Sequence, residues 1–325
     1  MSRARRDTPD YNRAVRFRFF RLRFHFDALG ALQFPAGKPG NIIRGAFGSI
    51  FRKIACVPEC VDAHTCERRA ICAYARTFEP ASLGDSPSGL SDWPRPFVFR
   101  ARHLDARTIP AGSRFHFDVN LFQLRDPPIE YFVLAFARLA EEGLGPGRGR
   151  AALAAVDQID PDGRPVWRLF DGQTLSGPAG MAPSEVTLER LSAPARRVEV
   201  RFLSPTELKH RHQLAQQPEF GVLMARIRDR LSTLSQLYGD GPLEMDFAEF
   251  GRRAQRVKMT RCELAGVEVS RLSARTGQRH PLGGFVGFAE YEGELAEFIP
   301  FLEAAQYSGV GRHTTWGKGE IQVPP

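Results

Sequence analysis

A run near the N-terminus, in which apolar and basic residues alternate, constrains the fold most strongly. In AVRFRFFRLRFHFD (residues 14–27) the apolar positions are Val15, Phe17, Phe19, Leu22, Phe24 and Phe26. The intervening positions carry Arg16, Arg18, Arg21 and Arg23. Alternation with a period of two, rich in aromatic residues, predicts a β-strand with one buried face. The alternation slips at Phe20–Arg21, which predicts a β-bulge there.

The patterns after this strand occur in the same order twice along the chain. In the first half a helix is expected over residues 41–55, with Asn41 as its N-cap, and another over 128–142; strands are expected over 96–102, 113–122, 153–158 and 166–170. A polar stretch that contains Pro and Gly, 171–196, is predicted to be a linker. In the second half helices are expected over 220–237 and 293–305, and strands over 198–203, 256–262, 267–272, 285–291 and 320–323.

This order of elements predicts an α+β fold made of two tandem ferredoxin-like (RRM-like) domains, because each half follows the β-α-β-β-α-β order of that unit. We place the first domain at residues 1–190 and the second at 191–325. A length of 325 residues suits two domains of ordinary size.

The charge balance favours an anionic partner, since 45 Lys and Arg against 37 acids give a formal net charge of +8. No segment approaches the roughly 20 consecutive apolar residues that span a bilayer, so no membrane partner is expected. The basic N-terminus lacks the apolar stretch of a secretory signal. We therefore expect a cytoplasmic protein.

Four of the five cysteines gather in one short segment with the spacing C-x3-C-x5-C-x5-C. In a reducing compartment such a cluster indicates a metal site rather than a disulfide framework. Cys56, Cys60, Cys66 and Cys72 together would close the tetrahedral shell of a structural zinc ion and leave no open position for catalysis. His64 is an alternative ligand. An iron–sulfur cluster, or free cysteines that pack a small core, are the other interpretations.

The C-terminal run YSGVGRHTTWGKGEIQV (residues 307–323) combines four glycines with a basic centre rich in hydroxyl groups. Glycine permits positive φ and close approach of the backbone, so N–H groups there can meet phosphates while Arg and Lys supply positive charge. The run lacks the spacing of a Walker motif. A tight turn between a helix and a strand is the alternative interpretation.

This run resembles the glycine-rich loop that ends the endoribonucleases of the RAMP superfamily, which cut CRISPR precursor transcripts. Four other segments resemble the same family. RFLSPTELK (201–209) resembles the strand that opens its second domain, and LGGFVG (282–287) resembles a later strand. Residues 269–275, with Arg271, Ser273 and Arg275, resemble its Arg-Tyr-Ser-x-Arg stretch, although Leu272 replaces the aromatic residue. Residues 40–56 through 72–80 resemble a branch that contains cysteines, which implies a cysteine-rich insertion (about 56–80) after the first helix.

The resemblance implies a sequence- and structure-specific endoribonuclease that binds CRISPR repeat RNA and cleaves precursor crRNA without a catalytic metal. The 2′-hydroxyl would attack the scissile phosphate and leave a 2′,3′-cyclic phosphate and a 5′-hydroxyl. Other subunits of a CRISPR effector complex are implied partners. The residues expected to bind RNA are Lys53, Arg271, Arg275, Gly309, Gly311, Arg312, Thr314, Thr315, Gly317, Lys318 and Gly319.

Such a reaction needs a base and an acid near neutral pKa, which histidine supplies. The candidates are His64, His210, His212 and His313. In the family the base often follows the first helix, and His64 is the histidine of that region, although it is equally a zinc-ligand candidate. His210 and His212 alternate and so point to one side, or belong to a solvated basic loop. His313 adjoins Arg312 and is a candidate acid or phosphate-binding residue.

Three further histidines, His25, His103 and His116, fall within strand patterns and are expected to be structural. Two alternative functions stay open. One is a non-catalytic RNA-binding subunit of a CRISPR effector complex on the same fold. The other is a zinc-stabilised scaffold whose positive charge serves a protein partner, which predicts no salt-sensitive binding of RNA.

Overall fold

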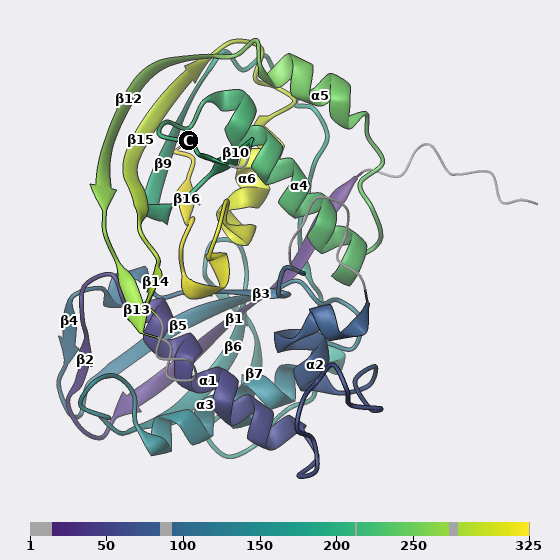
Figure 1. Ribbon diagram of the computed structural model, residues 1–325. Helices are drawn as coiled ribbons and strands as arrows, with labels where there is room; N and C mark the ends of the chain where they lie inside the picture. Colours follow the sequence, from purple (N-terminus) through teal and green to yellow (C-terminus); the bar gives the residue numbers. More distant parts are fainter. Residues whose placement is uncertain (1–14, 85–92, 212, 273–278, 325) are drawn as a thin grey trace, which may run out of the picture.

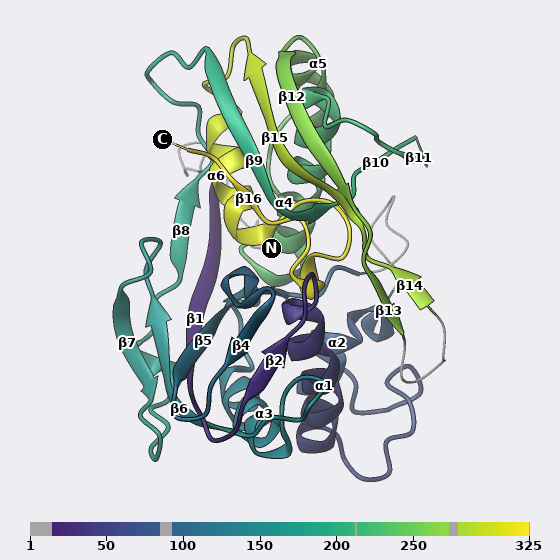
Figure 2. The ribbon, with the colours of Figure 1, turned by 90° about the vertical axis from the view of Figure 1, so that its left-hand side faces the viewer.

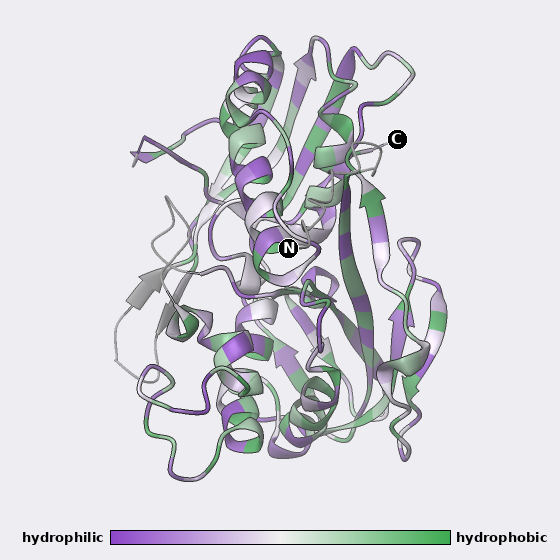
Figure 3. Ribbon diagram, turned by 90° about the vertical axis from the view of Figure 1, so that its right-hand side faces the viewer, coloured by the Kyte–Doolittle hydropathy of each residue, from purple (hydrophilic) through white to green (hydrophobic). Residues whose placement is uncertain are grey.

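The computed structural model describes residues 15–84, 93–211, 213–272 and 279–324, and shows two α+β units stacked one above the other (Figure 1). Each unit is an antiparallel sheet with helices against one face. Figure 2 shows the sheets of both units from the side. Along their strands, hydrophilic and hydrophobic bands alternate (Figure 3), as expected for sheets with one face in a core.

The first unit has the ferredoxin-like order with two strands added to its sheet. Its strands and helices are β1 (Arg16–Ala28), α1 (Pro39–Ala55), β3 (Phe97–Arg100), β5 (Arg114–Leu121), α3 (Ile129–Glu142), β6 (Ala151–Ile159) and β7 (Pro165–Phe170). The sheet order is β3-β5-β1-β6-β7. The added strands are β7 and β8 (Ser184–Thr187), the second of which pairs with β1. Helices α1 and α3 cover one face, where a core rich in phenylalanine forms.

The second unit repeats the arrangement. It contains β9 (Arg197–Thr206), α4 (Phe220–Tyr238), α5 (Phe247–Ala254), β12 (Lys258–Val267), β15 (Gly284–Glu292), α6 (Ile299–Ser308) and β16 (Ile321–Gln322). Its sheet order, β12-β15-β9-β16, is the order of β3-β5-β1-β6 in the first unit. The predicted fold of two tandem ferredoxin-like units is confirmed.

Short elements connect the main ones. Two-stranded sheets form from β2 (Leu32–Phe34) with β4 (Arg107–Ile109), β10 (Lys209–His210) with β11 (Gln213–Leu214), and β13 (Ser270–Leu272) with β14 (Arg279–Pro281). The short helices are α2 (Ala73–Phe78), η1 (Pro80–Leu83), η2 (Arg102–Leu104), η3 (Pro178–Gly180) and η4 (Thr314–Trp316). Among the described residues, no helix combines the length and the apolar character needed to cross a membrane.

The slip in the alternation of β1 is a change of core rather than the predicted bulge. Phe17 and Phe19 are buried in the core of the second unit, whereas Phe20 and the apolar residues after it are buried in the core of the first. The irregularity that the strand does have lies between His25 and Phe26, opposite β6. The two faces of β1 therefore pack in two different cores.

Other predicted boundaries also differ from the structure. The expected linker, 171–196, contains β8 (Ser184–Thr187), which pairs with the start of β1. Helix α1 begins at Pro39 with Lys38 as N-cap rather than at Asn41, because proline suits the first helical turn. The strand expected over 256–262 is longer, since β12 continues to Val267, and the strand expected over 267–272 is the short β13. The last helix, α6, lies six residues later than expected at its start, at Ile299.

Candidate functional site

The glycine-rich segment, residues 309–319, joins α6 to β16 and lies where the two units meet (Figure 1). Gly309, Gly311, Gly317 and Gly319 have φ of 71°, 78°, 74° and 65°. A methyl group would overlap the carbonyl oxygen of Glu207 at Gly311 and that of Val310 at Gly319. The segment therefore needs glycine both for its backbone conformation and for close packing.

The segment packs on the N-terminal end of α1 in the first unit. The buried Lys318 donates from Nζ to the carbonyl oxygen of Gly37 at 3.0 Å. The Arg44 guanidinium lies 3.6 Å from the centre of the Trp316 ring, a cation–π contact. A Cβ at Gly40 would lie 2.5 Å from the Trp316 carbonyl oxygen. The positive charge of Lys318 therefore lies in the contact between the two units rather than at the surface.

A second contact brings the turn after β9 beside the same segment. The backbone N–H of Arg312 donates to the carbonyl oxygen of Glu207 at 3.0 Å, and its guanidinium pairs with the Glu207 carboxylate. Lys209, His210 and Arg211 follow after the buried Leu208 and are exposed. Together with Arg312, also exposed, they make a positive surface at the glycine-rich segment, which we call the basic turn.

The predicted RNA-binding residues differ from one another in their exposure to solvent. Arg312 and Lys53 are exposed, and Gly311 and Gly317 are half-buried. Those that are buried are Gly309, Thr314, Thr315, Lys318 and Gly319. Arg271 belongs to β13, but its side chain and the whole of Arg275 lie outside the described residues. Binding of RNA by these residues stays a prediction.

The three predicted catalytic histidines that the structure describes do not form one cluster. His64 is exposed in the cysteine-rich insertion, where its backbone N–H donates to Asp62 Oδ1 at 2.6 Å. His210 is exposed in β10 of the second unit, and His212 lies outside the described residues. His313 is half-buried with a left-handed φ of 60°. Of these, His210 and His313 belong to the basic turn and the segment beside it.

A histidine group that the sequence patterns do not reveal lies on the face of the first sheet opposite its helices. His103 Nε2 lies 2.8 Å from the carbonyl oxygen of His116, and the two rings stack with centroids 4.5 Å apart. His25, on the neighbouring strand, lies 6.0 Å from His116 between ring centroids. Its Nε2 lies 3.2 Å from Asp157 Oδ2. His25 and His116 are directly opposite each other in the β1–β5 register, which no sequence spacing shows.

Ion pairs flank this histidine group. Arg23 donates to both carboxylate oxygens of Asp118, at 2.8 and 3.0 Å, and Arg168 pairs with Asp157. Burial, followed by the neighbouring His103 and Arg23, lowers the pKa of His116 to about 4. Burial also lowers the pKa of His25. Both imidazoles are consequently neutral at neutral pH.

The four clustered cysteines lie close to one another at the junction of α1 and α2. Cys56 caps the end of α1 and Cys72 the start of α2. Burial, followed by the adjacent thiols of Cys72 and Cys60, raises the pKa of Cys56 to about 12, and Cys60 in turn adjoins Cys66. Within the described residues, no three His, Cys, Asp or Glu side chains surround one position as metal ligands do. The thiols are adjacent without forming a closed shell.

Comparisons with known proteins divide the chain at the same place as the fold. Residues 17–179 match the model of the AF_1859_N N-terminal domain, and residues 200–321 match that of the CRISPR-associated endoribonuclease Cas6. No curated protein matches the chain.

Solved structures share the fold at low identity. Similar chains include a Cas6 (TTHA0078) product complex (19% identical, 95% of this chain and 100% of that chain, TM-score 0.50). Thermus thermophilus Cas6 (TTHB231) is 15% identical over 94% of this chain and 98% of that chain, with a TM-score of 0.50. A partial Cas6-RT-Cas1–Cas2 complex is 13% identical over 94% of this chain and 46% of that chain, with a TM-score of 0.52.

Proposed function

Because this chain belongs to the Cas6 family of CRISPR-associated, RAMP-type endoribonucleases, we propose that it binds the repeat of a CRISPR precursor transcript and cuts it once. The observation that carries the proposal is the match over residues 200–321. This range includes the glycine-rich segment and the basic turn, which lie together. Exposed cations grouped beside such a segment suit an RNA backbone.

The proposed binding surface is the basic turn. Lys209, Arg211 and Arg312 would neutralise phosphates, and the exposed part of the glycine-rich segment admits close approach of the RNA backbone. The buried members, Lys318 among them, would act by fixing the segment against α1. Specificity for a repeat would come from RNA shape and a few base contacts.

The proposed chemistry is an attack by the RNA on itself. The 2′-hydroxyl oxygen forms a bond to the adjacent phosphorus while the bond to the 5′-oxygen of the next nucleotide breaks. A base removes the 2′-hydroxyl proton and an acid gives a proton to the leaving oxygen. The products are a 2′,3′-cyclic phosphate and a 5′-hydroxyl. We assign these proton transfers to His313 and His210, since His313 directly follows Arg312 and His210 lies three residues after Glu207, which pairs with Arg312. The charge of Arg312 would stabilise the phosphorane.

Two further proposals concern partners and metal. The fold is shared with a chain of a partial Cas6-RT-Cas1–Cas2 complex, and we propose that other CRISPR proteins contact this chain as well as its RNA. We also propose that the four thiols of the insertion bind a structural zinc ion. Their adjacency supports this, because thiolates are preferred zinc ligands.

The test uses end-labelled repeat RNA incubated with the protein in excess EDTA. A matched RNA carries a single 2′-deoxy nucleotide at the observed cut. One discrete cut that persists in EDTA and is absent from the 2′-deoxy RNA is the expected result. Tight binding without a cut would instead indicate a non-catalytic RNA-binding subunit, and salt-insensitive or absent binding would contradict both.

A further inference from the structure

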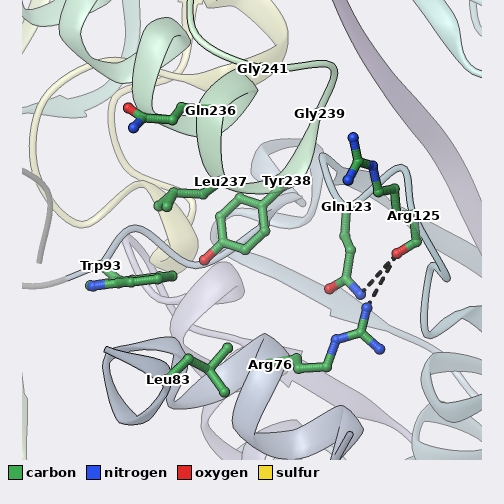
Figure 4. Close-up of a pocket in the computed structure, with 10 residues that line it drawn as sticks. All are labelled: Arg76, Leu83, Trp93, Gln123, Arg125, Gln236, Leu237, Tyr238, Gly239 and Gly241. Atoms are coloured by element: carbon green, nitrogen blue, oxygen red, sulfur yellow. Dashed lines mark hydrogen bonds between the residues drawn. The ribbon is translucent and has the colours of Figure 1, made fainter. Parts of the chain in front are cut away.

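A pocket of about 230 Å³ lies between the two units, away from the basic turn. Figure 4 shows its walls. The first unit contributes residues from α2, from η1 and from the segments before β3 and after β5, and the second contributes the C-terminal end of α4. This volume far exceeds the roughly 30 Å³ of one water molecule and is below the roughly 300 Å³ of the smallest drug-sized pockets. It suits a single ring system.

Aromatic and aliphatic side chains form most of the wall. The rings of Trp93 and Tyr238 lie on adjoining sides, with Leu237 above and Leu83 below in the view of Figure 4. The Tyr238 hydroxyl donates to the carbonyl oxygen of Pro94 at 2.7 Å, which fixes the ring beside Trp93. Flat apolar walls of this kind accept a nucleobase by stacking, whatever its sequence.

One buried amide faces Trp93 across the pocket. Gln123 is only 4% exposed, and its Nε2 donates to the carbonyl oxygens of Arg125 at 3.3 Å and Asp126 at 2.9 Å. Carbonyl oxygens only accept, so these two bonds fix which way the amide is turned. Its Oε1 is turned toward Trp93 (Figure 4) and is buried without a hydrogen-bond partner in the part of the chain that the structure describes. A ligand that brings an N–H group would satisfy it.

Two arginines, Arg76 and Arg125, lie at the rim of the pocket. Arg76 is held by Asp126 at 2.6 Å and by the carbonyl oxygen of Arg125 at 3.3 Å. The Arg125 side chain is exposed and points away from Arg76 in Figure 4. Among the described residues its guanidinium forms no ion pair, so it is placed to meet an anion outside the pocket.

We propose that this pocket takes one unpaired nucleobase of the RNA substrate. The base stacks on Trp93, donates an N–H to Gln123 Oε1, and leaves its phosphate at Arg125. Every nucleobase that pairs by Watson–Crick hydrogen bonds carries an N–H donor, so the pocket recognises that a base is unpaired rather than which base it is. The inference rests on RNA being the substrate, and extends recognition beyond the glycine-rich segment to a second position on the strand.

The experiment is a double-mutant cycle in which one change is made in the protein, one in the RNA, and the binding affinity is measured. A non-cleavable 2′-deoxy repeat RNA is synthesised with an abasic site at each unpaired position in turn, and its affinity is measured for wild type and for Trp93→Leu. At one position the abasic site should weaken binding of wild type about tenfold or more, the usual size of a lost base stack. The same RNA change should have no added effect on Trp93→Leu. Trp167→Leu, at an indole that is 39% exposed on β7, is the matched control and should behave as wild type.

Arg125→Gln keeps the inference testable if Trp93→Leu fails to fold, because the Arg125 side chain is exposed. It should weaken binding and reduce the dependence of log affinity on log salt by about one phosphate contact. If repeat RNA is bound and cut normally but no abasic position couples to Trp93, the pocket proposal is wrong and the proposed function stands. Loss of all RNA binding by wild type would remove the proposed function itself. If free nucleoside monophosphates fill the pocket and no RNA position couples to it, the ligand is a small molecule and the proposal is also wrong.

Discussion

Phe19 and Phe20 are consecutive residues of β1, and their side chains are buried in different cores. The Phe19 ring stacks on Tyr307 of α6 with centroids 4.4 Å apart, whereas Phe20 belongs to the core beneath α1 and α3. Adjacent side chains of a strand point to opposite faces. The first strand of one unit is therefore a structural part of the other.

We predict from this that Phe19→Ala destabilises the whole chain, although Phe19 belongs to the first unit by sequence. Truncating a buried phenylalanine costs about 3–5 kcal/mol. Guanidinium unfolding followed by tryptophan fluorescence should show one transition at a lower midpoint. Leu29→Ala, at a side chain that is 62% exposed, should leave the midpoint unchanged. Two separate transitions in wild type would contradict the shared core.

Lys318 and Arg312 lie in the same segment, and we predict that they act differently. Lys318 is 4% exposed and holds the carbonyl oxygen of Gly37, so Lys318→Met should lower the free energy of unfolding by about 1–3 kcal/mol. Arg312→Gln changes an exposed side chain and should lower RNA affinity with little change in stability. Thermal melting and RNA titration of both variants check this. An unchanged melting temperature for Lys318→Met would mean that its contact with α1 contributes nothing.

The glycines allow a sharper comparison, since they differ in what surrounds them. A methyl group at Gly319, whose φ is 65°, would overlap the Val310 carbonyl oxygen, whereas Gly45 in α1 has open space around it. Gly319→Ala should therefore destabilise the protein and reduce RNA cleavage. Gly45→Ala should stabilise it by up to about 1 kcal/mol, because alanine loses less backbone entropy in a helix. Calorimetric melting of the two variants tests both signs.

The sequence determined the order of elements well because that order depends on local patterns. Periodicity reports which face of an element is buried, and it located both sheets and most helices. The slip in alternation at Phe20 was interpreted wrongly as a bulge, since alternation alone does not distinguish a bulge from a second core. Periodicity also left 171–196 as a linker, because β8 is short and depends on pairing with β1.

The site was less predictable because it depends on which distant residues meet. The contact between Arg312 and Glu207 joins residues that are far apart in the chain, as does the register that opposes His25 and His116. Neither leaves a spacing that can be read from the sequence. The four cysteines were recognisable because all lie within one short segment.

The histidine group predicts how stability depends on pH. The folded protein holds the pKa of His116 at about 4, below its ordinary 6.5, because of burial and of the nearby His103 and Arg23, which outweigh Asp118. Between pH 4 and 6.5, His116 is protonated in the unfolded chain but stays neutral in the folded chain. The free energy of unfolding therefore falls as the pH drops below about 6.5. The side chain is half-buried and partly screened by solvent, so we expect a contribution of only about 1 kcal/mol.

Melting temperatures of wild type and His116→Gln between pH 7.5 and 5 measure this contribution. Wild type should lose more stability than the variant over that range. The titratable groups that face the ring, on His25, His103, Arg23 and Asp118, are the same in both proteins, so the difference reports His116 itself. Parallel curves of melting temperature against pH for the two proteins would show that folding does not lower the pKa of His116.

The proposed zinc ion gives a prediction that separates structure from catalysis. Protein purified without chelators should contain about one zinc ion per chain, and the double variant Cys56→Ser, Cys72→Ser should contain none. Its melting temperature should fall, because a structural metal contributes folding free energy. Cys262→Ser, at the distant fifth cysteine, is the matched control and should keep both the metal and the melting temperature.

Removing the metal should affect the insertion rather than the chemistry. At saturating protein, repeat RNA should still be cut in EDTA at a temperature where the chain stays folded, because the proposed proton transfers belong to His210 and His313. Elemental analysis and a cleavage time course on the same sample test the two parts together. Metal-free protein that melts like the untreated sample would show that the thiols do not hold a structural ion. Cleavage that stops with EDTA while the melting temperature is unchanged would place a metal in the reaction itself.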